Sequence, residues 1–200
     1  FGWVHFEFIE FQEARRAFES ALDVQRIASQ GDPQNGPLMF GTATTLCNLG
    51  YLYRYRDMHI KASLVLREAV QLQESVLGRS HATVLSTLDN LADSFANSGN
   101  TADALRTYNI ILERFRFGGR TDSVKMSRAK AVLLYKMSRV HRQRKDRANQ
   151  LDTLQKALQS MNKFSNSNLG DGEPDSLERR IQYDIAACRE QLEKDARNKT

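Results

Sequence analysis

The chain has 200 residues, of which 40% are hydrophobic and 26% charged, and its formal net charge is +5 at pH 7. This length and apolar content suffice to bury a core, which excludes a disordered chain. No run of 18 apolar residues occurs, so no membrane span is predicted, and the start lacks the regions of a signal peptide. Only three prolines and eleven glycines interrupt the sequence. The composition therefore favours a soluble, all-α protein.

The first 31 residues are predicted to form a partial repeat. Phe1-Gly2-x2-His5 fits only the latter half of a first helix, and Ala14, Phe18, Ala21 and Leu22 lie on a second helix. We therefore expect the natural chain to continue upstream of Phe1.

Residues 38–78 are predicted to form a second repeat of two helices. Leu46, Leu49 and Tyr53 recur at helical spacing and form one apolar stripe, and a second stripe begins twelve residues after Gly50, at Ala62. The turn-rich segment 32–37 precedes this repeat, and Gly78 closes it.

Residues 80–118 repeat the same organisation. Leu88, Leu91 and Phe95 form the first stripe, and a second stripe begins at Ala104, twelve residues after Ala92. Gly118-Gly119 is predicted to end this unit.

Residues 122–161 are predicted to form a fourth, degenerate and basic repeat. Ser138 and Gln150 keep the spacing of twelve, but several of the expected apolar residues are replaced. Ten lysines and arginines and two aspartates lie between Arg120 and Ala148, so this segment carries +8 and the rest of the chain −3. A charged, solvated face is the commonest reason for such a run.

The last predicted elements are a polar loop at 162–174 and a capping helix at 175–197. The loop is too poor in apolar residues to pack. The helix should begin with Asp175 or Ser176 as its N-cap. Its apolar face is formed by five residues: Leu177, Ile181, Ile185, Cys188 and Leu192. The charged opposite face suits a terminal helix, which must present a polar surface to water.

These units resemble the tetratricopeptide repeat, whose pattern is large-x2-L-G-x2-Y…A-x3-F-x2-A. The matching stretches are Leu46-x2-Leu49-Gly50-x2-Tyr53…Ala62-x3-Leu66-x2-Ala69 and Leu88-x2-Leu91-Ala92-x2-Phe95…Ala104-x3-Tyr108-x2-Ile111. The 42-residue step between them, with the segment 74–83, is most similar to the kinesin light chain type, although Ala82 stands where that type usually has proline. The resemblance implies one right-handed α-solenoid over residues 1–200, built from helix–turn–helix repeats.

The sequence carries no motif for catalysis or for a cofactor or metal ion. Cys47 and Cys188 lie far apart with no histidine at ligand spacing, which indicates partly buried thiols in a reducing, cytoplasm-like compartment. His5 and His141 fall where the repeat packs an aromatic ring, and His81 is expected to cap a helix. We therefore predict a protein that is not an enzyme.

The resemblance implies that first helices line the inner surface of the solenoid, so their polar residues are the candidate contacts for a protein or peptide partner. Asn48 and Asn90 occupy equivalent positions, and an asparagine there resembles the one that holds the ligand backbone in peptide-binding members. Acidic residues in the third unit beside basic residues in the fourth suggest an internal, partly acidic peptide. The full predicted set is Thr44, Asn48, Tyr51, Tyr55, Ser86, Asp89, Asn90, Asp93, Asn97, Tyr135, Lys136, Arg139, Arg142 and Gln143.

Two alternatives remain open on the sequence alone. The outer face or the ends of the chain, with Trp3, Phe6 and Phe8, could pack within a larger assembly. The basic fourth unit could instead neutralise RNA or another polyanion, which is the less favoured alternative.

Overall fold

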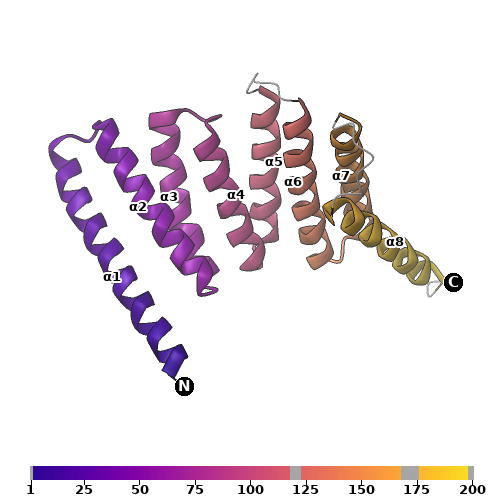
Figure 1. Ribbon diagram of the computed structural model, residues 1–200, viewed down its shortest axis with the longest axis horizontal. Helices are drawn as coiled ribbons and strands as arrows, with labels where there is room; N and C mark the ends of the chain where they lie inside the picture. Colours follow the sequence, from indigo (N-terminus) through magenta and orange to yellow (C-terminus); the bar gives the residue numbers. More distant parts are fainter. Residues whose placement is uncertain (1, 118–122, 168–175, 198–200) are drawn as a thin grey trace. The chain divides into compact units, whose positions relative to one another are not determined.

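A computed structural model of the chain describes residues 2–117, 123–167 and 176–197, and their side chains within 9–115, 126–163 and 176–197. The described residues form eight helices (Figure 1): α1 (Gly2–Gly31), α2 (Gly36–Tyr55), α3 (His59–Leu77), α4 (Ala82–Asn97), α5 (Thr101–Phe117), α6 (Ser123–Gln143), α7 (Arg147–Ser167) and α8 (Ser176–Arg197). The all-α prediction is confirmed. None of these helices is long and apolar enough to cross a bilayer.

The chain divides into two compact units, residues 1–107 and 108–200, with the division inside α5. In the first unit α1 packs on α2, α2 on α3, and α3 on α4; in the second, α6 packs on α7 and α7 on α8. Each helix is amphipathic and cannot bury its stripe alone, so packing on a neighbour is what stabilises it.

The N-terminal helix differs from the sequence prediction. Residues 2–31 form one uninterrupted helix, whereas the end of a first helix and a separate second helix were expected. The reason is local, because no glycine or proline occurs between Val4 and Arg26 to stop the helix. Phe11 and Leu22 are its buried anchors. The side chains for which aromatic packing or an assembly contact was predicted at this end, Trp3, His5, Phe6 and Phe8, lie outside the described side chains.

Four helices share one spacing of core residues. Positions separated by four, three and four residues face the neighbouring helices on α2, α4 and α8, and on α6 at all but the first position, which is exposed. We call this set the 4-3-4 stripe. Its members are Thr42, Leu46, Leu49 and Tyr53; Val84, Leu88, Leu91 and Phe95; Lys130, Leu134, Met137 and His141; and Ile181, Ile185, Cys188 and Leu192. The predicted apolar face of the last helix is thereby confirmed at Ile181, Ile185 and Cys188, which are buried.

The helix ends are held by side-chain caps. The Oδ1 atom of Asn35 accepts a hydrogen bond from the Leu38 backbone N–H at 2.9 Å, and Nδ1 of His81 accepts one from the Thr83 N–H at 3.2 Å. The capping role predicted for His81 is confirmed. Gly78 ends α3 with a φ of 81°, as the sequence predicted.

The α2–α3, α4–α5 and α6–α7 turns each have one left-handed residue at an equivalent position. These residues are Asp57, Gly99 and Lys145, with φ values of 54°, 83° and 57°. Only glycine adopts this conformation without steric cost. The flanking helices therefore impose the turn on Asp57 and Lys145.

The end of α7 also differs from the prediction. The loop was expected from Asn162, but helix continues to Ser167. Met161 is fully buried and anchors this last stretch of helix. Three predictions lie outside the residues that the structure describes: the rest of the loop at 168–174, the break at Gly118-Gly119 and the N-cap at Asp175.

The contact between Gly50 and Leu66 makes α2 and α3 approach closely. A Cβ atom added at Gly50 would lie 2.7 Å from both Cγ and Cδ2 of Leu66. We expect Gly50→Ala to lower the free energy of unfolding by about 1–3 kcal/mol, measured by urea denaturation, because Leu66 is fully buried and cannot move aside. Gly41→Ala on the same helix is the control, since the nearest atom there is 3.7 Å away. That change should be neutral or stabilising by up to about 1 kcal/mol, and an equal loss for both variants would contradict the prediction.

His141 occupies the stripe position of Tyr53 and Phe95. Burial lowers the pKa of this imidazole below its ordinary value, although Asp146, whose Oδ2 atom lies 3.6 Å from Nδ1, acts in the opposite direction. The unfolded chain therefore takes up the proton more readily, and stability should fall as the pH drops below about 6.5. Between about pH 7.5 and 5.5, the urea concentration at the midpoint of unfolding should fall less in His141→Phe than in the wild type. His81→Asn, which keeps the helix cap, should behave as the wild type; an unchanged loss in His141→Phe would show that another group is responsible.

Candidate functional site

A hollow of about 500 Å³ opens between α2 and α4 in the first unit. Phe40, Thr44, Cys47 and Tyr51 of α2 line one side, Ala82, Thr83, Ser86 and Thr87 of α4 line the other, and Gln73 of α3 completes it. Phe40 and Tyr51 are large exposed side chains. The hollow therefore combines aromatic edges with a mainly apolar lining that carries a few polar side chains.

Gln73 is the unusual member of this hollow. Its side chain is almost fully buried, with 2% of its surface exposed. Its Nε2 atom donates to the Cys47 sulfur at 3.4 Å, but Oε1 has no hydrogen-bond partner among the described residues. An unpaired buried amide oxygen costs free energy until a hydrogen-bond donor reaches it.

Cys47 and Thr87 are two further polar side chains of the hollow. The Cys47 sulfur lies 3.6 Å from Oγ1 of Thr87. Burial raises the pKa of the Cys47 thiol, and the hydrogen bonds from Thr87 and Gln73 only partly oppose this rise. The thiol therefore stays protonated at neutral pH and acts as a small, weakly polar side chain.

Beside the hollow, a hydrogen-bond network joins α2 to α4. Nδ2 of Asn90 donates to the Tyr51 hydroxyl at 2.8 Å, and Arg54 donates to both Oδ1 of Asn90 and Oδ2 of Asp93, the latter at 3.4 Å. Four groups at the surface of the first unit are thereby oriented by one another. The predicted ligand-holding amide of Asn90 is already engaged by its neighbours.

The remaining predicted residues of the first unit are spread along the same two helices. Thr44 and Ser86 lie in the hollow, and Asp89 is half-buried. Asn48, Tyr55 and Asn97 are exposed, with Tyr55 and Asn97 at the C-terminal ends of their helices. Tyr51, Asn90 and Asp93 are thus brought together, whereas Tyr55 and Asn97 lie outside the hollow.

In the second unit the predicted residues lie on α6. The Tyr135 hydroxyl donates to Oδ2 of Asp184 on α8 at 2.9 Å. Burial raises the pKa of Tyr135, and the neighbouring Asp184 carboxylate raises it further. Arg180 and Arg139 lower the pKa of the same tyrosine. Tyr135 therefore links α6 to α8 through this hydrogen bond.

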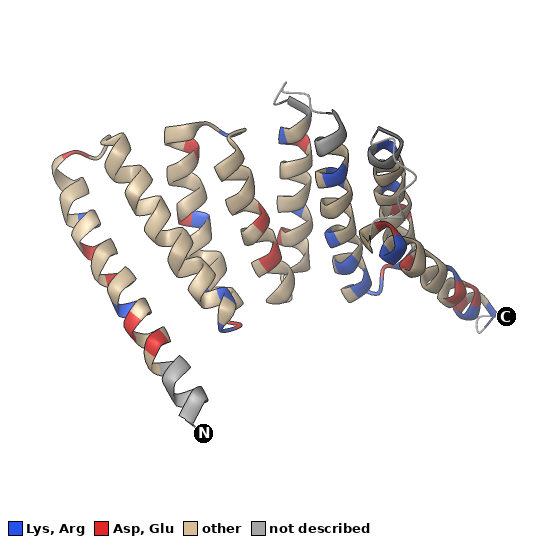
Figure 2. Cartoon of the chain, in the orientation of Figure 1, with Lys and Arg blue, Asp and Glu red and all other residues tan. Residues whose placement is uncertain are grey.

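The basic residues of α6 remain accessible. Arg139, Arg142 and Gln143 are exposed, and Lys136 is half-buried. Figure 2 shows the lysine and arginine positions of α6 in blue. Among the described residues neither Arg139 nor Arg142 forms an ion pair. Arg180 of α8, which the sequence did not single out, acts electrostatically on the same tyrosine as Arg139.

Sequence reasoning missed Phe40, Cys47, Gln73 and Thr87. The signal for Gln73 was present, because it is a polar residue four positions after Ala69 on a stripe of otherwise small or apolar side chains. The described side chains contain no group of three or more His, Cys, Asp or Glu residues that could hold a metal ion.

Comparison with known proteins finds a family match for part of the chain. Residues 41–116 match the tetratricopeptide repeat model. No curated protein sequence matches the chain.

Solved structures share its fold at low sequence identity. BtubC (BKLC) from P. vanneervenii is 15% identical with a TM-score of 0.60 over 91% of this chain, and the match covers 66% of that protein, just under two thirds of its length. The nearly identical TPR-like repeats of a putative kinesin light chain from Podosopora anserina are 14% identical with a TM-score of 0.65, covering 94% of this chain and 82% of that one. A variant form of the same repeats is 13% identical with a TM-score of 0.56, covering 94% and 91%. The solenoid fold predicted from the resemblance is confirmed.

The hydrogen bond from Tyr135 to Asp184 should determine how firmly α8 is held. We expect Tyr135→Phe to weaken the attachment of α8 by about 1.5 kcal/mol, because a half-buried carboxylate loses its donor. Faster amide hydrogen exchange confined to α8 would show this. Tyr183→Phe is the matched control, since Tyr183 lies on the same helix and is 73% exposed. If the two variants exchange alike, this hydrogen bond does not hold the helix.

Proposed function

Because residues 41–116 are tetratricopeptide repeats, we propose that the chain is a non-catalytic protein-binding module that holds an extended, partly acidic peptide segment against its first helices. The repeat fold supports a role in protein–protein interaction. The peptide class is our proposal. It rests chiefly on the unpaired amide oxygen of Gln73 in the hollow between α2 and α4.

The hollow suits a segment that brings its own N–H donor. A peptide in extended conformation presents backbone N–H groups and alternate side chains. One amide can pair with Oε1 of Gln73 once this buried carboxamide turns toward the hollow, while a neighbouring side chain lies between Phe40 and Tyr51. The Tyr51–Asn90–Arg54 network is ordered before any ligand arrives, which lowers the entropic cost of binding.

The acidic character of the peptide is inferred from the second unit. Arg139 and Arg142 are exposed cations of α6 without an ion pair among the described side chains. Guanidinium groups recognise carboxylates through paired hydrogen bonds. Asp or Glu side chains of the ligand are therefore the natural partners.

A display library of random peptides of about 12 residues tests the proposal. Selection on the wild-type chain should enrich Asp and Glu, and selection on the Arg139→Glu, Arg142→Glu double variant should not. Gln73→Met should weaken the selected peptides about 5–20-fold in fluorescence polarisation, because the acceptor is lost. The same substitution should leave the fold equally or more stable, by about 1 kcal/mol, because an unpaired buried oxygen is removed.

Gln71→Met is the matched control, since Gln71 is exposed on the same helix two residues away. It should bind as the wild type. Undiminished affinity in Gln73→Met and in the double arginine variant would contradict the peptide proposal. Binding of a short single-stranded RNA that falls steeply with salt would instead support the polyanion alternative.

A further inference from the structure

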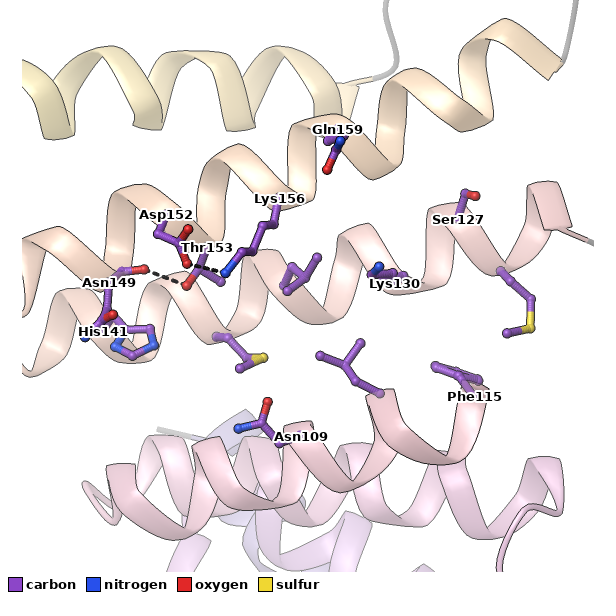
Figure 3. Close-up of a pocket in the computed structure, with 14 residues that line it drawn as sticks. Asn109, Phe115, Ser127, Lys130, His141, Asn149, Asp152, Thr153, Lys156 and Gln159 are labelled. Atoms are coloured by element: carbon purple, nitrogen blue, oxygen red, sulfur yellow. Dashed lines mark hydrogen bonds and ion pairs between the residues drawn. The ribbon is translucent and has the colours of Figure 1, made fainter. Parts of the chain in front are cut away.

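A second hollow, of about 610 Å³, lies in the second unit between α5, α6 and α7. Its apolar lining comes from Leu112 and Phe115 of α5 and from Met126, Leu134 and Met137 of α6. Lys130 of α6 and Lys156 of α7 supply amines (Figure 3). Its volume is in the range of small-molecule sites. None of the residues predicted to contact a peptide lines this hollow.

The hollow arises from one departure in the 4-3-4 stripe. The first stripe position is Thr42 in α2, Val84 in α4 and Ile181 in α8, which are 9%, 0% and 0% exposed. The equivalent residue of α6 is Lys130, which is exposed. A lysine cannot be buried without a partner, so the stripe stays open where the other helices close it.

The charge of the hollow is positive. Lys130 makes no hydrogen bond or ion pair with any part of the chain that the structure describes. Nζ of Lys156 lies 2.5 Å from Oδ2 of Asp152, so this pair is neutral overall. Asn109 adds an exposed carboxamide from α5. The lining therefore offers one unneutralised ammonium group beside an apolar surface.

We propose that this hollow binds a small organic monoanion with an apolar body, such as an aliphatic or aryl carboxylate. The apolar body lies against Leu112, Leu134 and Met137, where it replaces the contacts that a buried stripe residue would make. The anionic head pairs with Lys130, which gains a charge-assisted hydrogen bond. The inference is independent of the peptide proposal, because Arg139 is nine residues from Lys130 and thus on the opposite side of α6.

Titration of the 200-residue chain with octanoate and 1-octanol, followed by methyl NMR, tests this site. Octanoate should shift the methyl signals of Leu112, Leu134 and Met137 and should bind at least about tenfold more tightly than 1-octanol. Lys130→Val, which installs the residue of α4, should abolish octanoate binding and raise the melting temperature. Lys130→Arg should retain binding, and Arg139→Glu is the matched control that should bind octanoate as the wild type.

Leu112→Phe distinguishes binding inside the hollow from binding to an exposed charge, because the larger side chain fills the cavity and Lys130 is kept. It should lose octanoate binding while the chain remains helical by circular dichroism. Equal affinity for octanoate and 1-octanol, full binding in Lys130→Val or in Leu112→Phe, or no methyl shifts at millimolar octanoate would each overturn the proposal.

Discussion

The burial of the 4-3-4 stripe against neighbouring helices is the constraint on which the structure depends. An isolated helix of about 20 residues with one apolar stripe is only marginally stable in water. In this chain α2 obtains burial from both α1 and α3, and the close contact of Gly50 with Leu66 shows how tightly the helices must approach. The caps, turns and polar surfaces are arranged around this packing.

The same constraint separates core from binding surface. Residues of the stripe are committed to neighbouring helices, so a ligand is left with the residues beside the stripe or with places where the stripe is incompletely closed. The hollow at Gln73 is of the first kind and the hollow at Lys130 is of the second. Two chemically different hollows thus follow from one packing rule.

Much of the fold could be predicted because periodic apolar residues report directly on burial. Leu46, Leu49, Leu88 and Leu91 were assigned to the core from spacing alone, and they are buried. The continuous α1 and the extension of α7 to Ser167 were missed, since a polar but glycine-free and proline-free segment carries no clear stop signal. The candidate site was harder to predict from the sequence. The unpaired oxygen of Gln73 and the hydrogen bond of Tyr135 to α8 both depend on which helices lie side by side, and the sequence of one helix does not show this.

The left-handed turn position has a consequence for how such repeats change over time. Aspartate, glycine and lysine all occupy it, so the turn survives without its best residue at a cost of about 1 kcal/mol. The architecture therefore tolerates drift at sites that consensus patterns treat as diagnostic. A repeat such as α6–α7 can lose most of its consensus residues, acquire a lysine in its 4-3-4 stripe, and still fold as a packed pair of helices. It can therefore present chemical groups that the other repeats lack.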